Sequence, residues 1–223
     1  MFRQVCRALI LYVFDPFMLA PIGALVVSRI RPRFQRPLWL RTFIWVEIGD
    51  LVQGLGYTTL GYLGIHNLWY RHVIQPLVFA GLLLVVYQLR PSSLLRKALF
   101  GLFLLAGLVA ALGGFVLDGL AYRNAIFTST QSLVFLLVSV LEMRHSLLFN
   151  DDAPPSRTPE FWLLSALLIY ASGGLIFNAT SNYFLRTLPP EVLLLPWLVA
   201  SIVNAAYNAL LAKVFLCPKP NRS

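Results

Sequence analysis

Seven long runs of apolar residues, separated by short polar segments, make up most of the 223-residue chain. A transmembrane α-helix needs about 20 predominantly apolar residues to cross the hydrocarbon core of a bilayer. The pattern therefore predicts an all-α membrane protein, a bundle of seven transmembrane helices that forms a single domain over residues 1–223. The predicted spans lie near residues 7–28, 39–65, 72–89, 96–118, 125–143, 160–181 and 191–216.

Proline and charged residues mark the ends of the predicted helices. The segments between the runs read RIRPRFQRP, LRPSSLLRK, NDDAPPSRTP and RTLPPE. Proline lacks the amide hydrogen that a continuing helix needs, and charged side chains favour water over lipid. These segments therefore predict breaks between separate helices, joined by short loops.

Composition places the protein in the membrane class. The chain is 58% hydrophobic and only 12% charged, with a mean hydropathy of +0.74, whereas soluble domains contain about 25% charged residues. The spans leave no room for a separate nucleotide-binding or DNA-binding domain. The sequence pI of about 10.0 reflects basic residues beside the apolar runs, which is typical of membrane topology signals. We therefore expect the lipid bilayer, and no nucleic acid, as a partner.

The distribution of basic residues predicts the orientation. If the N-terminus is outside, 13 of the 18 Lys and Arg residues fall in the cytoplasmic segments. Every cytoplasmic segment then carries at least two basic residues, and each external loop carries one. The positive-inside rule favours this arrangement. We expect a multi-pass membrane protein, N-out and C-in.

The second predicted span contains two acids in the segment IWVEIGDLVQGLGY. Measured from a start near residue 39, Glu47 lies about 12 Å and Asp50 about 16 Å along the helix, close to mid-membrane. Their i, i+3 spacing puts both on one face. Because a carboxylate facing lipid is costly, this face is predicted to point into the bundle, with at least one acid protonated at neutral pH. The face continues through Gly54, Tyr57, Thr58 and Gly61.

Polar stripes on three other predicted helices offer partners, and such stripes commonly hold membrane helices together by hydrogen bonds. The seventh helix carries Ser201, Asn204 and Asn208, with Asn204 near the depth of Asp50. The fifth and sixth carry Thr128, Ser132, Ser139 and Glu142, and Ser165, Ser172 and Asn178. We expect Asp118 and Glu142 to be solvated near the interfaces. The predicted ligand-binding residues are Glu47, Asp50, Tyr57, Asn204 and Asn208.

The sequence predicts neither a metal nor a cofactor. His66 and His72, in HNLWYRH, are assigned to an external loop at a spacing that does not suit a metal, so we expect no buried histidine. A retinal protein would need a lysine midway along the last helix, whereas Lys213 lies near its end. Cys6 and Cys217 lie near opposite chain ends, on opposite membrane faces of the predicted topology, and are expected to be unpaired thiols.

Three stretches resemble a known family. HNLWYRHVIQPLVFAGLLL, PEFWLLSALLIYASGGLIF and IVNAAYNALLAKVFLC are similar to an uncharacterised family of small seven-helix inner-membrane proteins found in Bacteroidetes. The glutamate that this family carries in helix two corresponds to Glu47. The family's acid early in helix three is replaced by the PLVF of residues 76–79. The resemblance implies a bacterial inner membrane and supplies no activity.

Two functional hypotheses remain open at this stage. The first is a sensor, receptor-like or small-ligand-binding protein with an intramembrane polar cavity, whose basic cytoplasmic face docks a protein partner or anionic lipid. The second is an integral-membrane enzyme that uses Glu47 or Asp50 as general acid or base on a lipophilic substrate. A proton-coupled carrier ranks third, because no internal repeat is evident. A purely structural role for the two acids also remains an alternative.

Overall fold

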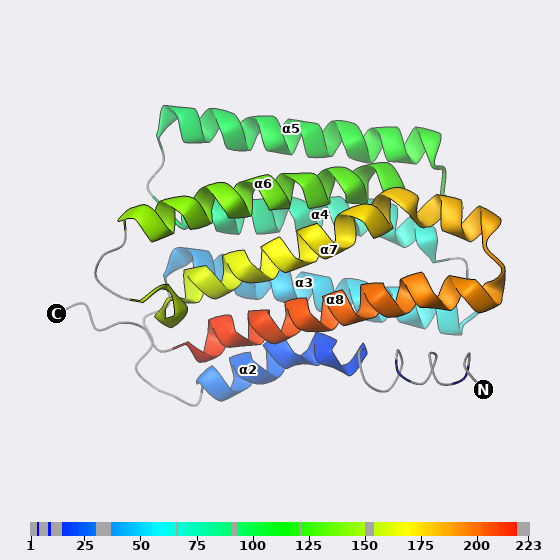
Figure 1. Ribbon diagram of the computed structural model, residues 1–223, viewed down its shortest axis with the longest axis horizontal. Helices are drawn as coiled ribbons and strands as arrows, with labels where there is room; N and C mark the ends of the chain where they lie inside the picture. Colours follow the sequence, from blue (N-terminus) through cyan, green and yellow to red (C-terminus); the bar gives the residue numbers. More distant parts are fainter. Residues whose placement is uncertain are drawn as a thin grey trace. The chain divides into compact units, whose positions relative to one another are not determined.

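The computed structural model describes residues 15–29, 37–65, 67–90, 93–120, 122–149 and 154–217, together with Gln4 and Leu9. Over these ranges the regular structure is helical, as predicted (Figure 1). The seven α-helices of the described residues are α2 (Ala20–Arg29), α3 (Leu38–Tyr62), α4 (Leu68–Gln88), α5 (Leu94–Leu117), α6 (Ala125–Phe149), α7 (Pro159–Thr187) and α8 (Pro190–Leu216). Two short 3₁₀ helices, η2 (Asp15–Leu19) and η3 (Pro155–Arg157), precede α2 and α7.

Five of these helices, α4 to α8, are long enough and apolar enough to cross a membrane. Helix α3 has 25 residues, which is sufficient length, but acidic and amide side chains at its centre lower its hydropathy. The apolar helix around α2 is short, covering Phe17–Val27, and the first half of the predicted span 7–28 lies mostly outside the described residues. The protein is therefore a helical, multi-pass membrane protein.

The chain divides into two compact units. The first, here called the α3–α6 unit, comprises Arg36–Val134 and Asn178–Asn182, and so contains α3, α4, α5, the beginning of α6 and a short piece of α7. The second, the α7–α8 unit, comprises Met1–Gln35, Phe135–Phe177 and Tyr183–Ser223. It contains α2, the rest of α6, most of α7 and all of α8.

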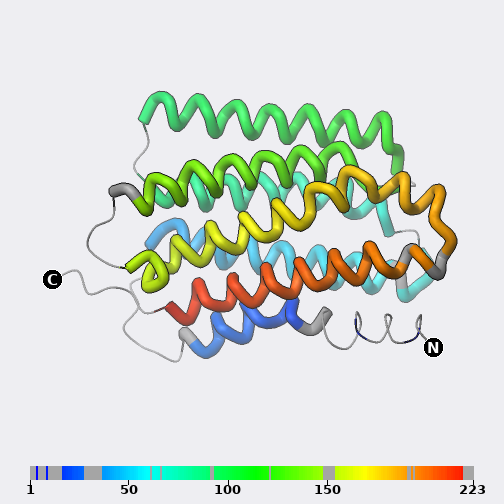
Figure 2. The backbone as a smooth tube through the Cα atoms, viewed as in Figure 1, coloured from blue at the N-terminus to red at the C-terminus, as the bar shows by residue number. Residues whose placement is uncertain are grey.

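An antiparallel hairpin of α3 and α4 forms the basis of the α3–α6 unit (Figure 2). The connecting turn is tight, with the amide of Leu63 on the Thr59 carbonyl at 3.0 Å and that of Ile65 on the Leu60 carbonyl at 2.9 Å. Gly64 occupies a positive φ of 70°, which a residue with a Cβ adopts only at a cost. The Asn67 side chain then donates to the Tyr57 carbonyl at 2.9 Å, tying the start of α4 to α3.

Glycines allow the helices of this unit to approach closely. A Cβ added to Gly81 would lie 2.7 Å from a Val46 methyl group, and one added to Gly107 would overlap the Phe79 ring. The first contact joins α4 to α3, and the second joins α5 to α4. The Phe79 ring in turn meets the Phe127 ring edge-on at 5.7 Å. Small residues at helix interfaces are the usual means of close packing in membranes.

A polar network joins α5, α6 and α7 at the α5–α6 connection. The Asp118 carboxylate accepts from the Ile126 amide at 3.1 Å and from the Asn182 side chain at 3.0 Å. Asn182 also accepts from the Arg123 amide at 3.1 Å and donates to the Arg123 carbonyl at 2.8 Å. Asp118 is therefore not simply solvated as predicted, because protein groups supply two of its hydrogen-bond partners.

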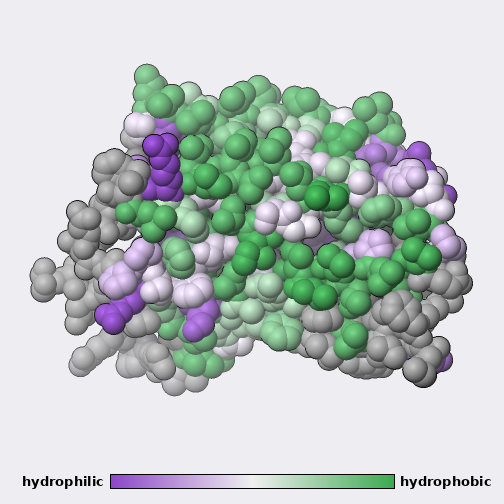
Figure 3. Space-filling model, viewed as in Figure 1, coloured by the Kyte–Doolittle hydropathy of each residue, from purple (hydrophilic) through white to green (hydrophobic). Residues whose placement is uncertain are grey.

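The outward surface of α5 is almost entirely apolar. Figure 3 shows hydrophobic residues over its upper part, where α5 lies. Between 57% and 76% of each of these side chains is exposed: Leu102, Leu105, Val109, Leu112 and Val116. In water this surface would be unfavourable, whereas in a bilayer it contacts acyl chains at no cost.

In the α7–α8 unit, α2 and η2 pack along α8, and aromatic pairs join α7 to α8. The ring centroids of Tyr170 and Tyr207 are 5.0 Å apart, and those of Phe177 and Trp197 are 5.2 Å apart. Cys217, after the end of α8, is a free, buried thiol as predicted, whereas Cys6 lies outside the described residues. Burial, reinforced by Glu160 and opposed by Lys213, raises the pKa of the Cys217 thiol, which favours its neutral form.

Candidate functional site

One face of α3 carries polar residues into the interior of the protein. Glu47 is 9% exposed and Gln53 is 6% exposed, while Asp50 and Tyr57 are half-buried. The opposite face presents Trp45, Val52 and Leu55, which are 55–72% exposed. In the middle of the helix the polar side chains therefore lie inward, while large apolar side chains face outward.

The prediction that the inward face of α3 continues to the C-terminal end of the helix is wrong. Thr58 is exposed, so the inward face does not continue through it, and the burial of Gly61 lies outside the described residues. The buried face instead includes Gln53, one turn after Asp50, which the sequence argument did not select. Of the predicted site residues on α3, the structure places Glu47, Asp50 and Tyr57 on the polar face with Gln53.

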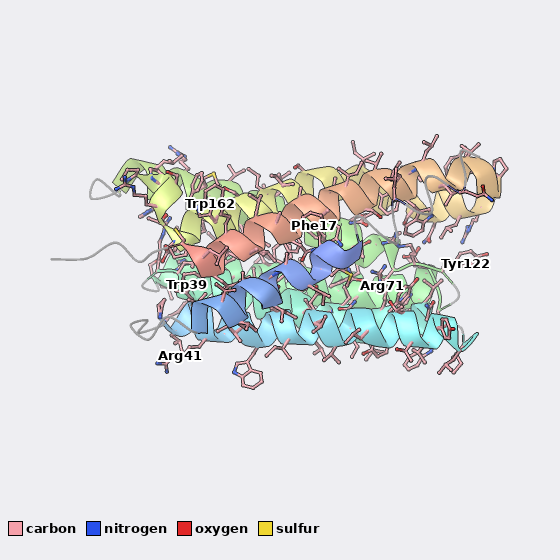
Figure 4. All side chains as sticks on the ribbon, turned by 90° about the horizontal axis from the view of Figure 1, so that it is seen from below. Phe17, Trp39, Arg41, Arg71, Tyr122 and Trp162 are labelled. Atoms are coloured by element: carbon pink, nitrogen blue, oxygen red, sulfur yellow. The ribbon has the colours of Figure 1, made fainter. Side chains whose placement is uncertain are left out.

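Helix α4 faces these residues with Arg71, which the sequence indicated only as one of the basic residues that set the topology. The Arg71 guanidinium lies 4.7 Å from the centre of the Tyr57 ring, a cation–π distance. It also interacts electrostatically with the Asp50 carboxylate. Figure 4 places Arg71 and Tyr122 toward one end of the α3–α6 unit, and Trp39 and Arg41 at the other.

His72 corrects a second prediction. It was assigned to an exposed loop, but it lies within the first turns of α4 and is only 6% exposed. Its Nε2 is 3.0 Å from the Tyr122 carbonyl, and because a carbonyl oxygen can only accept, Nε2 is the donor. In the neutral ring, Nδ1 is then an acceptor. The loop assignment failed because the aromatic and polar letters of HNLWYRH hide a helix that begins at Leu68.

Gln75 extends the polar residues of α4 to α6. Its side-chain nitrogen donates to the Gln131 Oε1 at 3.2 Å, and Gln131 is 4% exposed. Amide pairs between membrane helices are typically interhelical bonds of modest strength. We use the name α3–α4 polar cluster for the buried or half-buried polar residues of these two helices and the α6 residue that Gln75 contacts. They are Glu47, Asp50, Gln53 and Tyr57 of α3, Arg71, His72 and Gln75 of α4, and Gln131 of α6.

Three buried atoms of this cluster lack a hydrogen-bond partner among the described residues. They are Gln53 Oε1, Arg71 Nε and His72 Nδ1. A buried polar atom left unsatisfied costs about 1–3 kcal/mol, and more when it is charged. Buried atoms of this kind are usually satisfied by ordered water or by a bound molecule.

The cluster is closed on the side away from the α3–α4 turn. Beyond Glu47 the two helices bury Phe43, Leu83 and Val86, each at most 1% exposed. The next polar contact is the hydrogen bond from Thr42 to the Gln88 Oε1 at 2.8 Å, at the far end of the hairpin. An apolar layer therefore separates the cluster from that end, and its polar residues extend only toward the turn.

The remaining predicted site residues, Asn204 and Asn208, lie on α8 in the α7–α8 unit. Asn208 is 6% exposed and its side chain donates to the Asn204 carbonyl at 2.9 Å, and Asn204 is half-buried. Their pairing with the acids of α3 stays a prediction. Within the described ranges, no group of three or more His, Cys, Asp or Glu residues is arranged to hold a metal ion.

The polar stripes on α6 and α7 have mixed outcomes. All four predicted α6 residues are buried, at 0–8% exposure: Thr128, Ser132, Ser139 and Glu142. The expected solvation of Glu142 is therefore wrong. Asn178 of α7 donates to the Ser132 hydroxyl at 3.1 Å, which confirms a helix-to-helix bond. Ser172 is exposed and bonds to its own helix at the Leu168 carbonyl.

Comparison with known protein families, with curated proteins and with solved structures finds no match to this chain.

Proposed function

We propose that the protein is a seven-span bacterial inner-membrane protein, N-out and C-in, that binds a small ligand at the α3–α4 polar cluster and acts as a sensor or receptor. Five apolar helices support the membrane location. The buried Glu47 and Gln53 support α3 as a further span whose polar face is shielded from lipid. The basic loops and the family resemblance favour the orientation and the bacterial inner membrane.

The observation that carries the ligand-binding proposal is the trio of unsatisfied buried atoms, on Gln53, Arg71 and His72. A purely structural polar contact between helices pairs its donors with its acceptors, as Gln75 and Gln131 do. Each of the three atoms instead retains hydrogen-bonding capacity, and Arg71 also interacts electrostatically with the Asp50 carboxylate. Because the cluster extends toward the α3–α4 turn, which the proposed topology puts outside, the ligand enters from the extracytoplasmic side.

The test is the double variant Glu47→Gln, Asp50→Asn, compared with Glu160→Gln as a control for loss of a carboxylate elsewhere. Native mass spectrometry of the purified proteins measures the small molecule that co-purifies. We expect a bound small molecule to co-purify with the wild type and with the control. The double variant should lose this molecule while still unfolding cooperatively. A double variant that retains the bound species, or that fails to fold while the control folds, overturns the proposal and assigns the acids a structural role.

The alternative function is an integral-membrane enzyme acting on a lipophilic substrate. The half-buried Asp50 lies one turn from the buried Glu47 and interacts with Arg71, which gives a carboxylate positioned for general acid–base catalysis. The two proposals differ in the small molecule that is recovered after incubation with the protein. A sensor releases its ligand unchanged, whereas an enzyme returns a product of different mass after incubation.

Basic side chains at the other end of the α3–α6 unit support a cytoplasmic docking role. Arg41 at the start of α3 and Lys97 at the start of α5 are both exposed. In the proposed topology both lie on the cytoplasmic side, where basic residues attract anionic lipid or an acidic protein partner.

A further inference from the structure

Two groups of opposite charge in the α3–α4 polar cluster interact without forming an ion pair. The Asp50 carboxylate on α3 and the Arg71 guanidinium on α4 interact electrostatically, but the described part of the chain contains no direct ion pair between them. A desolvated charge is costly unless an opposite charge touches it. This arrangement leaves both charged groups able to accept a partner.

The Arg71 guanidinium is held in position for an anion. Its carbon lies 4.7 Å from the centre of the Tyr57 ring, so the ring supports the guanidinium by a cation–π contact. Its Nε is buried and has no hydrogen-bond partner among the described residues. The planar, forked donors of arginine match the two oxygens of a carboxylate or phosphate.

The α3 side of the cluster offers acceptors for a cation. Gln53 Oε1 is buried without a partner and lies one helical turn from Asp50, on the same face. An ammonium group carries three N–H donors, and a carboxylate with an adjacent amide oxygen satisfies two of them. Glu47, one turn further along, adds a second carboxylate to this side.

We infer that the α3–α4 polar cluster binds a small zwitterion, with its anionic group on Arg71 and its ammonium group on Asp50 and Gln53. This inference rests on the proposed ligand-binding function and names the chemistry of that ligand. A simple cation would leave Arg71 unpaired, and a simple anion would leave Asp50 unpaired. Two sources supply this chemistry, a free amino acid or the headgroup of phosphatidylethanolamine.

The experiment uses the full-length protein in nanodiscs of phosphatidylglycerol, which contain no zwitterion. Glycine, alanine, leucine and glutamine are titrated by calorimetry, each against its N-acetyl form, which lacks the cation, and its amide, which lacks the anion. We expect at least one zwitterion to bind at least about tenfold more tightly than both of its analogues, since a site built for a polar group rejects a ligand lacking it. Nanodiscs that contain phosphatidylethanolamine test the lipid source by the rise in unfolding temperature over phosphatidylglycerol alone.

Variants assign each end of the ligand. Arg71→Gln should remove the preference over the amide, and Asp50→Asn should remove the preference over the N-acetyl form. Arg186→Gln removes an exposed basic residue in the last turn of α7 and should change neither. If Arg71→Gln does not fold, Arg71→Lys is the second variant. It keeps the positive charge but lacks the paired N–H donors of the guanidinium, so it should weaken the preference for the zwitterion over its amide.

The outcomes separate this inference from the function on which it rests. Equal binding of zwitterions and analogues, or no response to either free amino acids or phosphatidylethanolamine, overturns the zwitterion. If a co-purifying molecule of other chemistry is still lost from the Glu47→Gln, Asp50→Asn variant, ligand binding at the cluster stands and only its assigned chemistry fails. A response to phosphatidylethanolamine alone, absent in Asp50→Asn, identifies the headgroup as the source.

Discussion

At the scale of single residues, Asn182 shows how one side chain can hold three segments together. Its amide accepts from the Arg123 amide and donates to both the Arg123 carbonyl and the Asp118 carboxylate. Asp118 in turn accepts from the Ile126 amide at the start of α6, where a negative charge also suits the helix dipole. The α5–α6 connection is thus fixed to α7 by polar contacts rather than by apolar packing.

Replacing Asn182 by Ala should destabilise the protein by about 1–3 kcal/mol, because it leaves an acceptor of Asp118 and two backbone groups of Arg123 without this partner. Thermal unfolding of the purified protein in detergent measures the effect. Thr187→Ala is the matched control, since the exposed Thr187 hydroxyl bonds only to the Tyr183 carbonyl of its own helix. A loss of stability no larger than that of the control would show that Asn182 does not act as this link.

At the scale of helices, the contact between α5 and α4 depends on the absence of a side chain at Gly107. An added methyl group would overlap the Phe79 ring, which is 2% exposed and cannot move aside easily. Gly101, on the same helix, has nothing within 4 Å of the corresponding position. The two glycines therefore form a matched pair.

Gly107→Ala should destabilise the protein by about 1–3 kcal/mol through overpacking. Gly101→Ala should be neutral or stabilising by up to about 1 kcal/mol, because alanine favours the helical backbone. Thermal unfolding of both variants in the same detergent makes the comparison. Equal stability of the two variants would contradict the close approach of α5 to α4.

The same scale shows what the sequence could and could not predict. The positions of α3 to α8 follow from apolar runs bounded by Pro and charge, and they agree with the helices within a few residues at most ends. The site was found only in part. Glu47 and Asp50 are conspicuous because acids are rare in apolar runs, whereas Gln53 and Gln75 are uncharged and give no comparable signal. Arg71 and His72 were missed because they lie next to a turn, where charged and aromatic residues usually indicate a loop.

At the scale of the whole molecule, the function depends on whether α3 crosses the membrane. Five helices qualify by length and composition, and α3 is not among them. Its polar residues are nevertheless largely buried, and its outward face is apolar. A helix shielded in this way can span a bilayer although its average hydropathy is low.

Reporter fusions should distinguish seven spans from five. Alkaline phosphatase, which is active only outside the cytoplasm, is inserted into residues 30–37 or into the α3–α4 turn at residues 63–67. If α3 spans the membrane, the first fusion should be inactive and the second active. Activity of both fusions would show that α3 does not cross the membrane, and would contradict the proposed topology. A fusion after residue 217 is the control, and is inactive in either case.

The short turn at Gly64 also constrains how the protein is made. Each carboxylate at the centre of an isolated helix raises the free energy of insertion by about 2.5–3.5 kcal/mol, so α3 alone would partition poorly from the translocon into lipid. Helix α4 follows after only a few residues and carries Arg71, which interacts with Asp50. If α3 spans the membrane, we therefore expect it to insert together with α4 as a hairpin rather than alone.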